Sequence, residues 1–240
     1  MILLRLRFAL LLLLPIFVSG CALAHAPDRR RPNLSAAQPA PFSVAPVRSA
    51  ARTGTYVAIG ASDTFGYGVP DPATEGWVPR FAATLPTGTR VVNLGVVGLT
   101  LHHALLVDLP VALDAHPNLV TVWLAVNDLL DGVPLAAYRA DLHTLLARLR
   151  AAHAQVLVGN LPDLALVPAA AARLGVAPAA TIAAWNAAIA GEAQATGATL
   201  VDLYSGWQQL AAHPEYVGPD GLHPSVAGYN RLAQIFAAAR

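Results

Sequence analysis

The chain alternates short apolar runs with longer stretches in which apolar residues recur every three or four positions. Short runs rich in β-branched side chains predict strands, and the three-to-four spacing predicts amphipathic helices. The predicted strands are 55–60 (TYVAIG), 90–94 (RVVNL), 119–125 (LVTVWLA), 155–159 (QVLVG) and 199–204 (TLVDLY). Because these runs are almost continuously apolar, we expect a sheet that is buried on both faces.

Two long helices are predicted between the later strands, over 134–154 and 181–197, and a third ends the chain. The apolar stripes of the two long helices consist of Leu135, Tyr138, Leu142, Leu145 and Leu149 and of Ile182, Trp185 and Ile189. Both stripes are expected to face the core rather than a cofactor. The alternation of strands and helices predicts a three-layer, doubly wound α/β domain with a mainly parallel, five-stranded sheet.

Residues 1–54 differ in composition from the rest of the chain. Arg5 and Arg7 precede an apolar stretch, 8–17, that is too short and too broken by proline for an ordinary membrane-spanning helix. A positive start, a short apolar stretch and small residues are typical of an export signal. Residues 22–54 hold five prolines and five arginines and predict an extended, poorly ordered tether.

The stretch Val18-Ser19-Gly20-Cys21 resembles the lipobox of bacterial lipoproteins. The resemblance implies a signal peptide over 1–20, lipidation of Cys21, and an exported protein anchored on the extracytoplasmic face of a membrane. The alternative is an ordinary export signal or signal anchor with an incidental cysteine. Cys21 is the only cysteine in the chain, so residues 55–240 have no disulfide and no catalytic thiol.

Charge separates the two parts of the chain as well. Residues 1–54 hold seven arginines and one aspartate, a net charge of +6, whereas residues 55–240 hold eight arginines and thirteen acidic residues, a net charge of −5. A folded domain that binds nucleic acid needs a basic face. The balance therefore argues against nucleic acid as the main partner.

Residues that can carry chemistry follow the predicted strands, at the edge where open α/β sheets place their sites. Ser62 follows the first strand, Gly95 and Gly98 follow the second, and Asn127 with Asp128 follows the third. Each of these segments, taken alone, also suits an ordinary turn or helix cap. The glycines do not have the G-x-G-x-x-G spacing of a dinucleotide site.

Asp220 and His223 lie on a turn bounded by glycine and proline, just before the last helix. With Ser62 they supply an alcohol, a base and a carboxylate that orients the base. A metal site is possible, but no second paired-histidine spacing completes one, and these three roles need no metal and no organic cofactor. The neighbours His102 and His103 would point to different sides of a helix and are expected at the surface or in a pocket wall.

Taken together, these segments are similar in type and order to the motifs of the SGNH, or GDSL-type, hydrolases. The matching positions are Gly60-Ala61-Ser62, Gly98, Ala125-Val126-Asn127-Asp128 and Asp220-Gly221-Leu222-His223. The resemblance covers 55–240 and implies the flavodoxin-like SGNH hydrolase fold. Ala61, Asp63 and Ala125 depart from the family pattern, which has aspartate, leucine and glycine there. An α/β-hydrolase elbow, G-x-S-x-G, fits less well because Thr64 stands where its last glycine should be.

The resemblance implies a serine esterase with Ser62 as nucleophile, His223 as base and Asp220 as the residue that orients it. It also implies an oxyanion hole formed by the backbone amides of Ser62 and Gly98 and the side chain of Asn127. The expected substrates are acyl lipids or O-acylated glycans, with Phe65, Leu129 and residues 160–166 lining the cleft. The alternatives are an acyltransferase that uses the same site and a catalytically silent surface lipoprotein that binds glycan or lipid.

Overall fold

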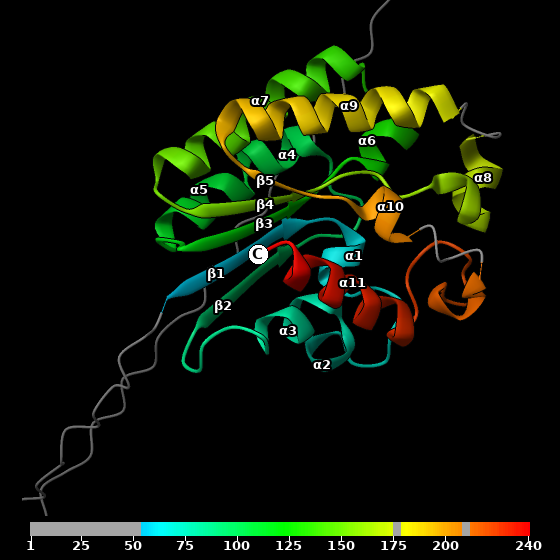
Figure 1. Cartoon of the computed structure of the whole chain (residues 1–240), viewed down its shortest axis with the longest axis horizontal. Coiled ribbons are helices and arrows are strands. Elements are labelled where there is room, and N and C mark those ends of the chain that lie inside the picture. The colour runs from blue at the N-terminus through cyan, green and yellow to red at the C-terminus, as the bar shows by residue number, and fades with distance from the viewer. Residues whose placement is uncertain (1–53, 175–178, 208–211) are drawn as a thin grey trace, which may run out of the picture. The chain divides into compact units, whose positions relative to one another are not determined.

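The sheet of the protein is wholly parallel and lies between two layers of helices (Figure 1). The computed structural model describes residues 54–174, 179–207 and 212–240. The strands are β1 (Thr55–Gly60), β2 (Arg90–Gly95), β3 (Leu119–Trp123), β4 (Gln155–Gly159) and β5 (Thr199–Val201). Their order is β2-β1-β3-β4-β5, and every neighbouring pair is parallel. This is the order of flavodoxin-like doubly wound sheets, so the predicted fold class is confirmed.

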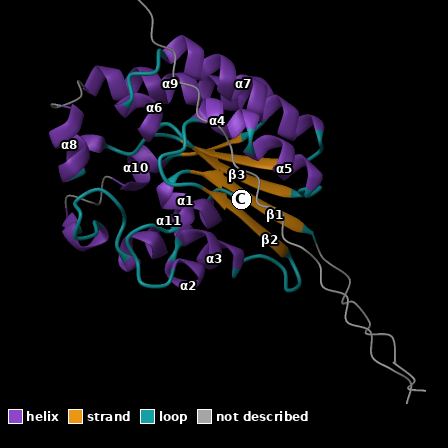
Figure 2. Ribbon diagram, turned by 180° about the vertical axis from the view of Figure 1, so that it is seen from behind, coloured by secondary structure: helices purple, strands orange, loops and turns teal. Residues whose placement is uncertain are grey.

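Helices cover both faces of the sheet, as Figures 1 and 2 show. One face carries α4 (Leu101–Leu106), α5 (Asp108–Asp114), α7 (Leu135–Ala151) and α9 (Ala179–Thr196). The other carries α1 (Ser62–Phe65), α2 (Pro72–Glu75), α3 (Trp77–Ala82) and α11 (Val226–Ala238). Shorter elements follow the later strands: α6 (Val126–Leu130), η1 (Leu164–Leu166), α8 (Pro168–Leu174), α10 (Leu203–Trp207) and η3 (Pro214–Tyr216). The three predicted helices are thus α7, α9 and α11.

The central and edge strands differ in burial, so the expectation of a sheet buried on both faces is confirmed for the central strands and corrected for the two edge strands. All of β3 and nearly all of β1 and β4 are buried. Strand β2 is an edge strand with partly exposed side chains, Val91 among them at 42% exposure, and β5 is buried only at Val201. The apolar runs look alike in sequence, but an edge strand has a neighbour on one side only.

Two strands end earlier than predicted, at Trp123 and Val201, because helices begin directly after them. The carbonyl of Ala125 accepts the amide of Leu129 at 2.9 Å, which starts α6. The side chain of Asp202 accepts the amide of Ser205 at 3.1 Å and caps α10. Capping carboxylates of this kind satisfy amides that have no partner within the helix. Residues 199–204 therefore combine a short strand with the start of a helix.

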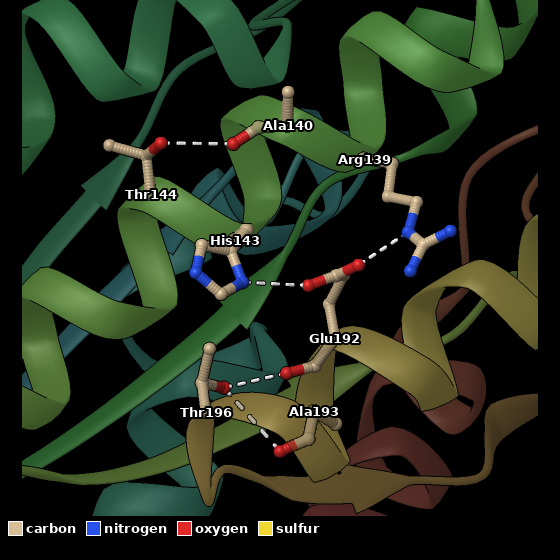
Figure 3. Close-up of polar contacts among 7 residues, drawn as sticks. All are labelled: Arg139, Ala140, His143, Thr144, Glu192, Ala193 and Thr196. Atoms are coloured by element: carbon tan, nitrogen blue, oxygen red, sulfur yellow. Dashed lines mark hydrogen bonds and ion pairs between the residues drawn. The ribbon is translucent and has the colours of Figure 1, made fainter.

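A buried carboxylate joins the two long helices on one face of the sheet (Figure 3). Glu192 of α9 accepts hydrogen bonds from Arg139 Nε, at 2.5 Å, and His143 Nδ1, at 2.8 Å, both on α7. The hydrogen bond from Arg139 lowers the pKa of Glu192, which burial opposes and His143 reinforces. On the same two helices, the rings of Tyr138 and Trp185, from the predicted stripes, pack with centroids 4.6 Å apart. The stripes therefore face the core as predicted.

The predicted signal peptide (1–20), Cys21 and the tether up to residue 53 lie outside the described residues, and those assignments stay predictions. Within the described ranges, no helix is both long and apolar enough to span a membrane.

Candidate active site

Ser62 lies at the carboxyl end of β1, as the first residue of the short helix α1. Ser62 is 9% exposed, and the turn before it is tight. A Cβ on Gly60 would lie 2.0 Å from Thr64 Oγ1, so only glycine fits there without a shift. Helix α1 ends at Phe65 and is followed by Gly66, whose φ of +90° also favours glycine. This turn lifts Ser62 above the edge of the sheet.

Asp220 and His223 form one rigid turn before α11. Asp220 Oδ1 accepts the backbone amides of Leu222 and His223 at 2.9 and 3.0 Å, and its Oδ2 contacts His223 Nδ1 at 2.5 Å. The amide of Gly218 donates to the carbonyl of His223 at 2.7 Å and closes the turn. The three-residue spacing therefore places the carboxylate against the imidazole, as the sequence predicted.

The imidazole of His223 reaches across to β1. His223 Nε2 lies 2.9 Å from Ser62 Oγ, so the structure joins Ser62, His223 and Asp220 in one hydrogen-bonded chain. When Asp220 accepts the proton of Nδ1, Nε2 is left as the acceptor for the serine hydroxyl. The ring of Tyr67 packs against the imidazole, with centroids 4.5 Å apart.

Asp220 is held in its charged form. Partial burial opposes ionisation, but hydrogen bonds from the His223 side chain and from the amides of Leu222 and His223 keep the pKa of Asp220 below its usual value. A charged carboxylate at this position stabilises a positive charge on the imidazole.

Asn127 and Asp128 follow β3, and both reach across to the loop that follows β2. Asn127 Nδ2 donates to the carbonyl of Leu99 at 2.9 Å, and the side chain also lines the cavity beside Ser62. Both carboxylate oxygens of Asp128 lie 3.1 Å from the amide of Leu101 at the start of α4. Burial raises the pKa of Asp128 to about 6. This pair therefore does not cap its own helix but fixes the position of a neighbouring loop.

Gly98 lies in that loop and lines the same cavity. Its φ of +78° is a conformation that favours glycine, and a Cβ there would meet nothing within 4 Å. Within the described ranges, the backbone amides of Ser62 and Gly98 have no hydrogen-bond acceptor. Two unpaired amides and one Asn127 N–H are thus available at a cavity that also holds Ser62 Oγ.

Sequence reasoning missed the role of Asn93. Its side chain donates to the carbonyl of Thr64 at 2.8 Å and accepts the amide of Gly95 at 2.9 Å, so it ties the end of β2 to α1. A Cβ on Gly95 would lie 2.2 Å from the amide nitrogen of Phe65, which explains the glycine. The available signal was an isolated asparagine in the apolar run 90–94.

The cavity beside Ser62 has a volume of about 230 Å³. It is lined by Ser62, Gly98, Asn127 and His223. Asp220 does not line it but contacts His223 Nδ1. Asp63 also lines it, and burial raises the pKa of Asp63 to about 6, with His223 opposing and Asp220 adding to the shift. Of the predicted cleft residues, 162 and 164 line the cavity.

Phe65 and Leu129 do not line the cavity, which corrects the expectation for them. Phe65 points outward and is 45% exposed, because α1 turns it away from the sheet. His102 and His103 lie on the surface of α4, where His102 contacts Asp141 at 3.0 Å and His103 contacts Thr100 at 2.9 Å. In the described part of the chain, no group of three or more His, Cys, Asp or Glu residues is arranged to hold a metal ion.

Comparison with known proteins agrees with this arrangement. The sequence matches the GDSL-like Lipase/Acylhydrolase family over residues 58–231. No curated protein matches it. The structure is similar to a crystal structure of TesA, with 26% identity, coverage of 77% of this chain and 97% of TesA, and a TM-score of 0.64.

Two esterases share the fold at lower identity. The acetylxylan esterase Axe2 from Geobacillus stearothermophilus is 20% identical, with 78% of this chain and 94% of Axe2 covered and a TM-score of 0.64. The psychrotrophic esterase EstA from Pseudoalteromonas sp. is 19% identical, with 78% and 96% covered and a TM-score of 0.60. The family match over most of the chain shows that the protein belongs to the GDSL-like lipase/acylhydrolase family and is a carboxylic ester hydrolase.

Proposed function

We propose that the protein is a serine esterase that hydrolyses carboxylic esters through an acyl-enzyme on Ser62. The observation that carries this proposal is the chain of contacts from Ser62 Oγ to His223 Nε2, at 2.9 Å, and from His223 Nδ1 to Asp220, at 2.5 Å. Nucleophile, base and orienting carboxylate must lie within hydrogen-bond reach for this chemistry.

In the first half of the reaction, Ser62 Oγ attacks the ester carbonyl carbon while His223 Nε2 takes the serine proton. The tetrahedral intermediate then breaks its bond to the alcohol oxygen, and His223 gives the same proton to the departing alcohol. In the second half, His223 takes a proton from water, whose oxygen attacks the acyl carbon. The bond from that carbon to Ser62 Oγ then breaks, His223 gives the proton to Oγ, and the acid departs. Asp220 stays ionised throughout and stabilises the imidazolium form of His223.

The negative oxygen of both intermediates needs hydrogen-bond donors. We assign this role to the amides of Ser62 and Gly98 and to the second N–H of the Asn127 side chain, which belong to residues that line the cavity and have no acceptor within the described ranges. Because the first Asn127 N–H is fixed on the carbonyl of Leu99, the second is held in place before a substrate binds.

The departures from the family pattern leave these groups intact. Ala125 has a φ of −179°, outside the left-handed region that favours glycine, so alanine fits there. Ala61 takes no part in proton transfer and lines the cavity with a methyl group.

The proposal is tested with Ser62→Ala in the full chain, assayed by hydrolysis of p-nitrophenyl esters and by labelling with a fluorophosphonate probe. We expect hydrolysis to fall by at least about 10³-fold and labelling to disappear. Ser205→Ala, at an exposed serine on α10, is the matched control and should behave as wild type. Activity and labelling that persist in Ser62→Ala would refute the proposal, and product analysis with a competing alcohol distinguishes hydrolysis from acyl transfer.

A further inference from the structure

A carboxylate lies where the family pattern has an apolar side chain. Asp63 directly follows the nucleophile, at the position that is leucine in that pattern. Among the described residues that line the cavity beside Ser62, Asp63 is the only acid, and none is an arginine or a lysine. The hydrolysis of an ester needs one nucleophile, one base and one orienting carboxylate, and Ser62, His223 and Asp220 already fill these roles. Asp63 therefore adds a charge that the proposed reaction does not itself require.

The Asp63 carboxylate has no hydrogen-bond partner. Within the described ranges it accepts no hydrogen bond, and the titratable groups that act on it are His223 and Asp220, before α11, and Tyr229, on α11. The residue is partly exposed and its oxygens are not sealed from solvent, so a ligand can reach them. A partly buried carboxylate without donors disfavours the folded state, which makes a functional role a reasonable explanation for it.

The other carboxylate beside His223 is already engaged. Asp220 accepts two backbone amides, those of Leu222 and His223, through Oδ1, and its Oδ2 contacts His223 Nδ1. Asp220 does not line the cavity. Among the described lining residues, Asp63 thus provides the one negative charge that no donor offsets.

This charge affects the step that the site has to promote. The negative oxygen of the tetrahedral intermediate forms beside the amide of Ser62, the residue before Asp63. Two negative charges that lie close together in a site with little water raise the energy of that intermediate. A positive charge on the substrate would offset the effect, and a negative charge would add to it. The site is therefore expected to distinguish esters by their charge.

The ring of Tyr67 indicates where the substrate carries that positive charge. His223 Nε2 gives its proton to the departing alcohol, so the alcohol lies next to His223. Tyr67 packs on the His223 ring with centroids 4.5 Å apart and is 45% exposed. The amide of Tyr67 donates to the carbonyl of Ser62 at 2.9 Å, which holds Asp63 and Tyr67 in one compact turn. Aromatic rings attract substituted ammonium groups, and a nearby carboxylate strengthens the attraction.

Resting on the proposed serine-esterase function, we propose that Asp63 and Tyr67 select esters whose alcohol carries a substituted ammonium group. The ammonium group lies on the exposed part of the Tyr67 ring, in the field of the Asp63 carboxylate, while Ser62 attacks the ester carbonyl. The cation then leaves with the alcohol, before water enters for the second half of the reaction. Asp63 determines specificity in this scheme and takes no part in proton transfer.

The test compares three butanoate esters of similar size with the full chain at about pH 8, by titrating the butanoic acid that is released. These are the 2-(trimethylammonio)ethyl ester, its uncharged isostere, the 3,3-dimethylbutyl ester, and the anionic 2-sulfoethyl ester. We expect kcat/KM of the cationic ester to exceed that of the isostere by at least about tenfold, and the anionic ester to be the slowest. A cationic-to-neutral ratio near one would overturn the inference.

Variants then assign the selectivity to its residues. Asp63→Asn and Asp63→Leu should each lower the cationic-to-neutral ratio to about threefold or less, the part that the Tyr67 ring provides, and Tyr67→Leu should lower it by about threefold. Asp114→Asn removes the same charge from an exposed residue of α5 outside the cavity lining, and it should keep the ratio of wild type. Because each readout is a ratio within one protein sample, partial loss of folded protein does not alter it.

The dependence on pH provides a second readout. Because burial raises the pKa of Asp63 to about 6, its carboxylate is charged above that pH and neutral below it. The ratio in wild type should therefore fall as the pH drops through about 6, whereas the ratio in Asp63→Asn should stay constant. Protonation of His223 slows both esters alike and cancels in the ratio. A wild-type ratio that does not change with pH would contradict the role of Asp63.

The outcomes separate this inference from the function on which it rests. A ratio near one, in a protein whose hydrolysis Ser62→Ala still abolishes, would overturn the selection of cationic esters and leave the serine esterase standing. A high ratio that persists in both Asp63 variants would overturn the assignment to Asp63. Hydrolysis that survives Ser62→Ala would instead count against the proposed function.

Discussion

Two carboxylate–imidazole pairs in this protein have similar bonds but opposite burial. Asp220 contacts His223 Nδ1 at 2.5 Å, and Glu192 contacts His143 Nδ1 at 2.8 Å. In the first pair the imidazole side chain is 12% exposed and the carboxylate 40%. In the second the imidazole is 55% exposed and the carboxylate 6%. The first pair therefore shields its imidazole and exposes its carboxylate, whereas the second pair does the opposite.

The two imidazoles also differ in what their second ring nitrogen faces, and this separates the catalytic pair from the structural one. His223 Nε2 faces Ser62 Oγ in a cavity that is also lined by Gly98 and Asn127, two of the assigned hydrogen-bond donors. His143 lies on the surface of α7, and the buried Glu192 also holds Arg139 (Figure 3). A carboxylate beside a histidine is thus a weak indication of catalysis. A shielded imidazole that touches a nucleophile beside hydrogen-bond donors is a strong one.

The largest effect should come from removing the two imidazoles in turn. We expect His223→Ala to lower kcat on a p-nitrophenyl ester by at least about 10³-fold, because Ser62 loses its base. His143→Ala should leave kcat within about twofold. It should lower the free energy of unfolding by no more than about 1 kcal/mol, because His143 is an exposed side chain and Glu192 keeps its contact with Arg139. Steady-state kinetics and urea denaturation of both variants provide the comparison. Equal losses of kcat would contradict the distinction between the pairs.

The second prediction removes a donor and leaves the Asp220–His223 pair intact. Asn127→Ala should lower kcat by about 10²–10³-fold with a smaller change in KM, because the donor acts on the charge that develops in the transition state. Asn118→Ala is the matched control, since Asn118 binds the amide of Thr55 at the amino end of the sheet, at 2.9 Å and away from the cavity. A kcat for Asn127→Ala within a factor of about three of wild type would exclude Asn127 from the oxyanion hole.

These variants test residues that sequence reasoning could locate and others that it could not. Ser62, Asn127 and the Asp220–His223 turn could be located because each directly follows a recognisable strand or precedes a helix, and parallel strands bring such segments to one edge. The side-chain contacts that hold distant segments together could not be predicted from the sequence. Asn93 meets Thr64, and Glu192 meets Arg139, only because of how distant segments pack.

The apolar pattern has a similar limit. It predicted the runs that became strands, but it did not distinguish the buried β3 from the exposed edge strand β2, because burial depends on what lies beside a strand. It also extended the last strand through Asp202, whose side chain starts α10 instead. Local chemistry at 199–204 was compatible with both structures, and the contact with Asn160, 42 residues away, favours the helix.

The smallest effect concerns the stability that Glu192 provides and how it depends on pH. Because the pKa of Glu192 is lower in the folded protein than in the unfolded chain, its contribution is present above the unfolded pKa of about 4.3 and is lost as the pH falls through the folded value. Glu192→Gln should lower the free energy of unfolding by about 1–2 kcal/mol at pH 7, a modest cost since Arg139 and His143 can turn to solvent.

Thermal unfolding of wild type and Glu192→Gln from pH 3 to pH 8 checks this. The difference in Tm should be about 2–8 °C near neutral pH and should shrink as the pH falls below about 4.3, because the unfolded chain and then the native Glu192 carboxylate take up a proton. Ester hydrolysis at 25 °C should stay within about twofold of wild type, since α7 and α9 hold this pair away from the Ser62 cavity. A Tm difference that grows on acidification would mean that Glu192 is protonated in the native state, and the pair would then owe its stability to packing rather than to charge.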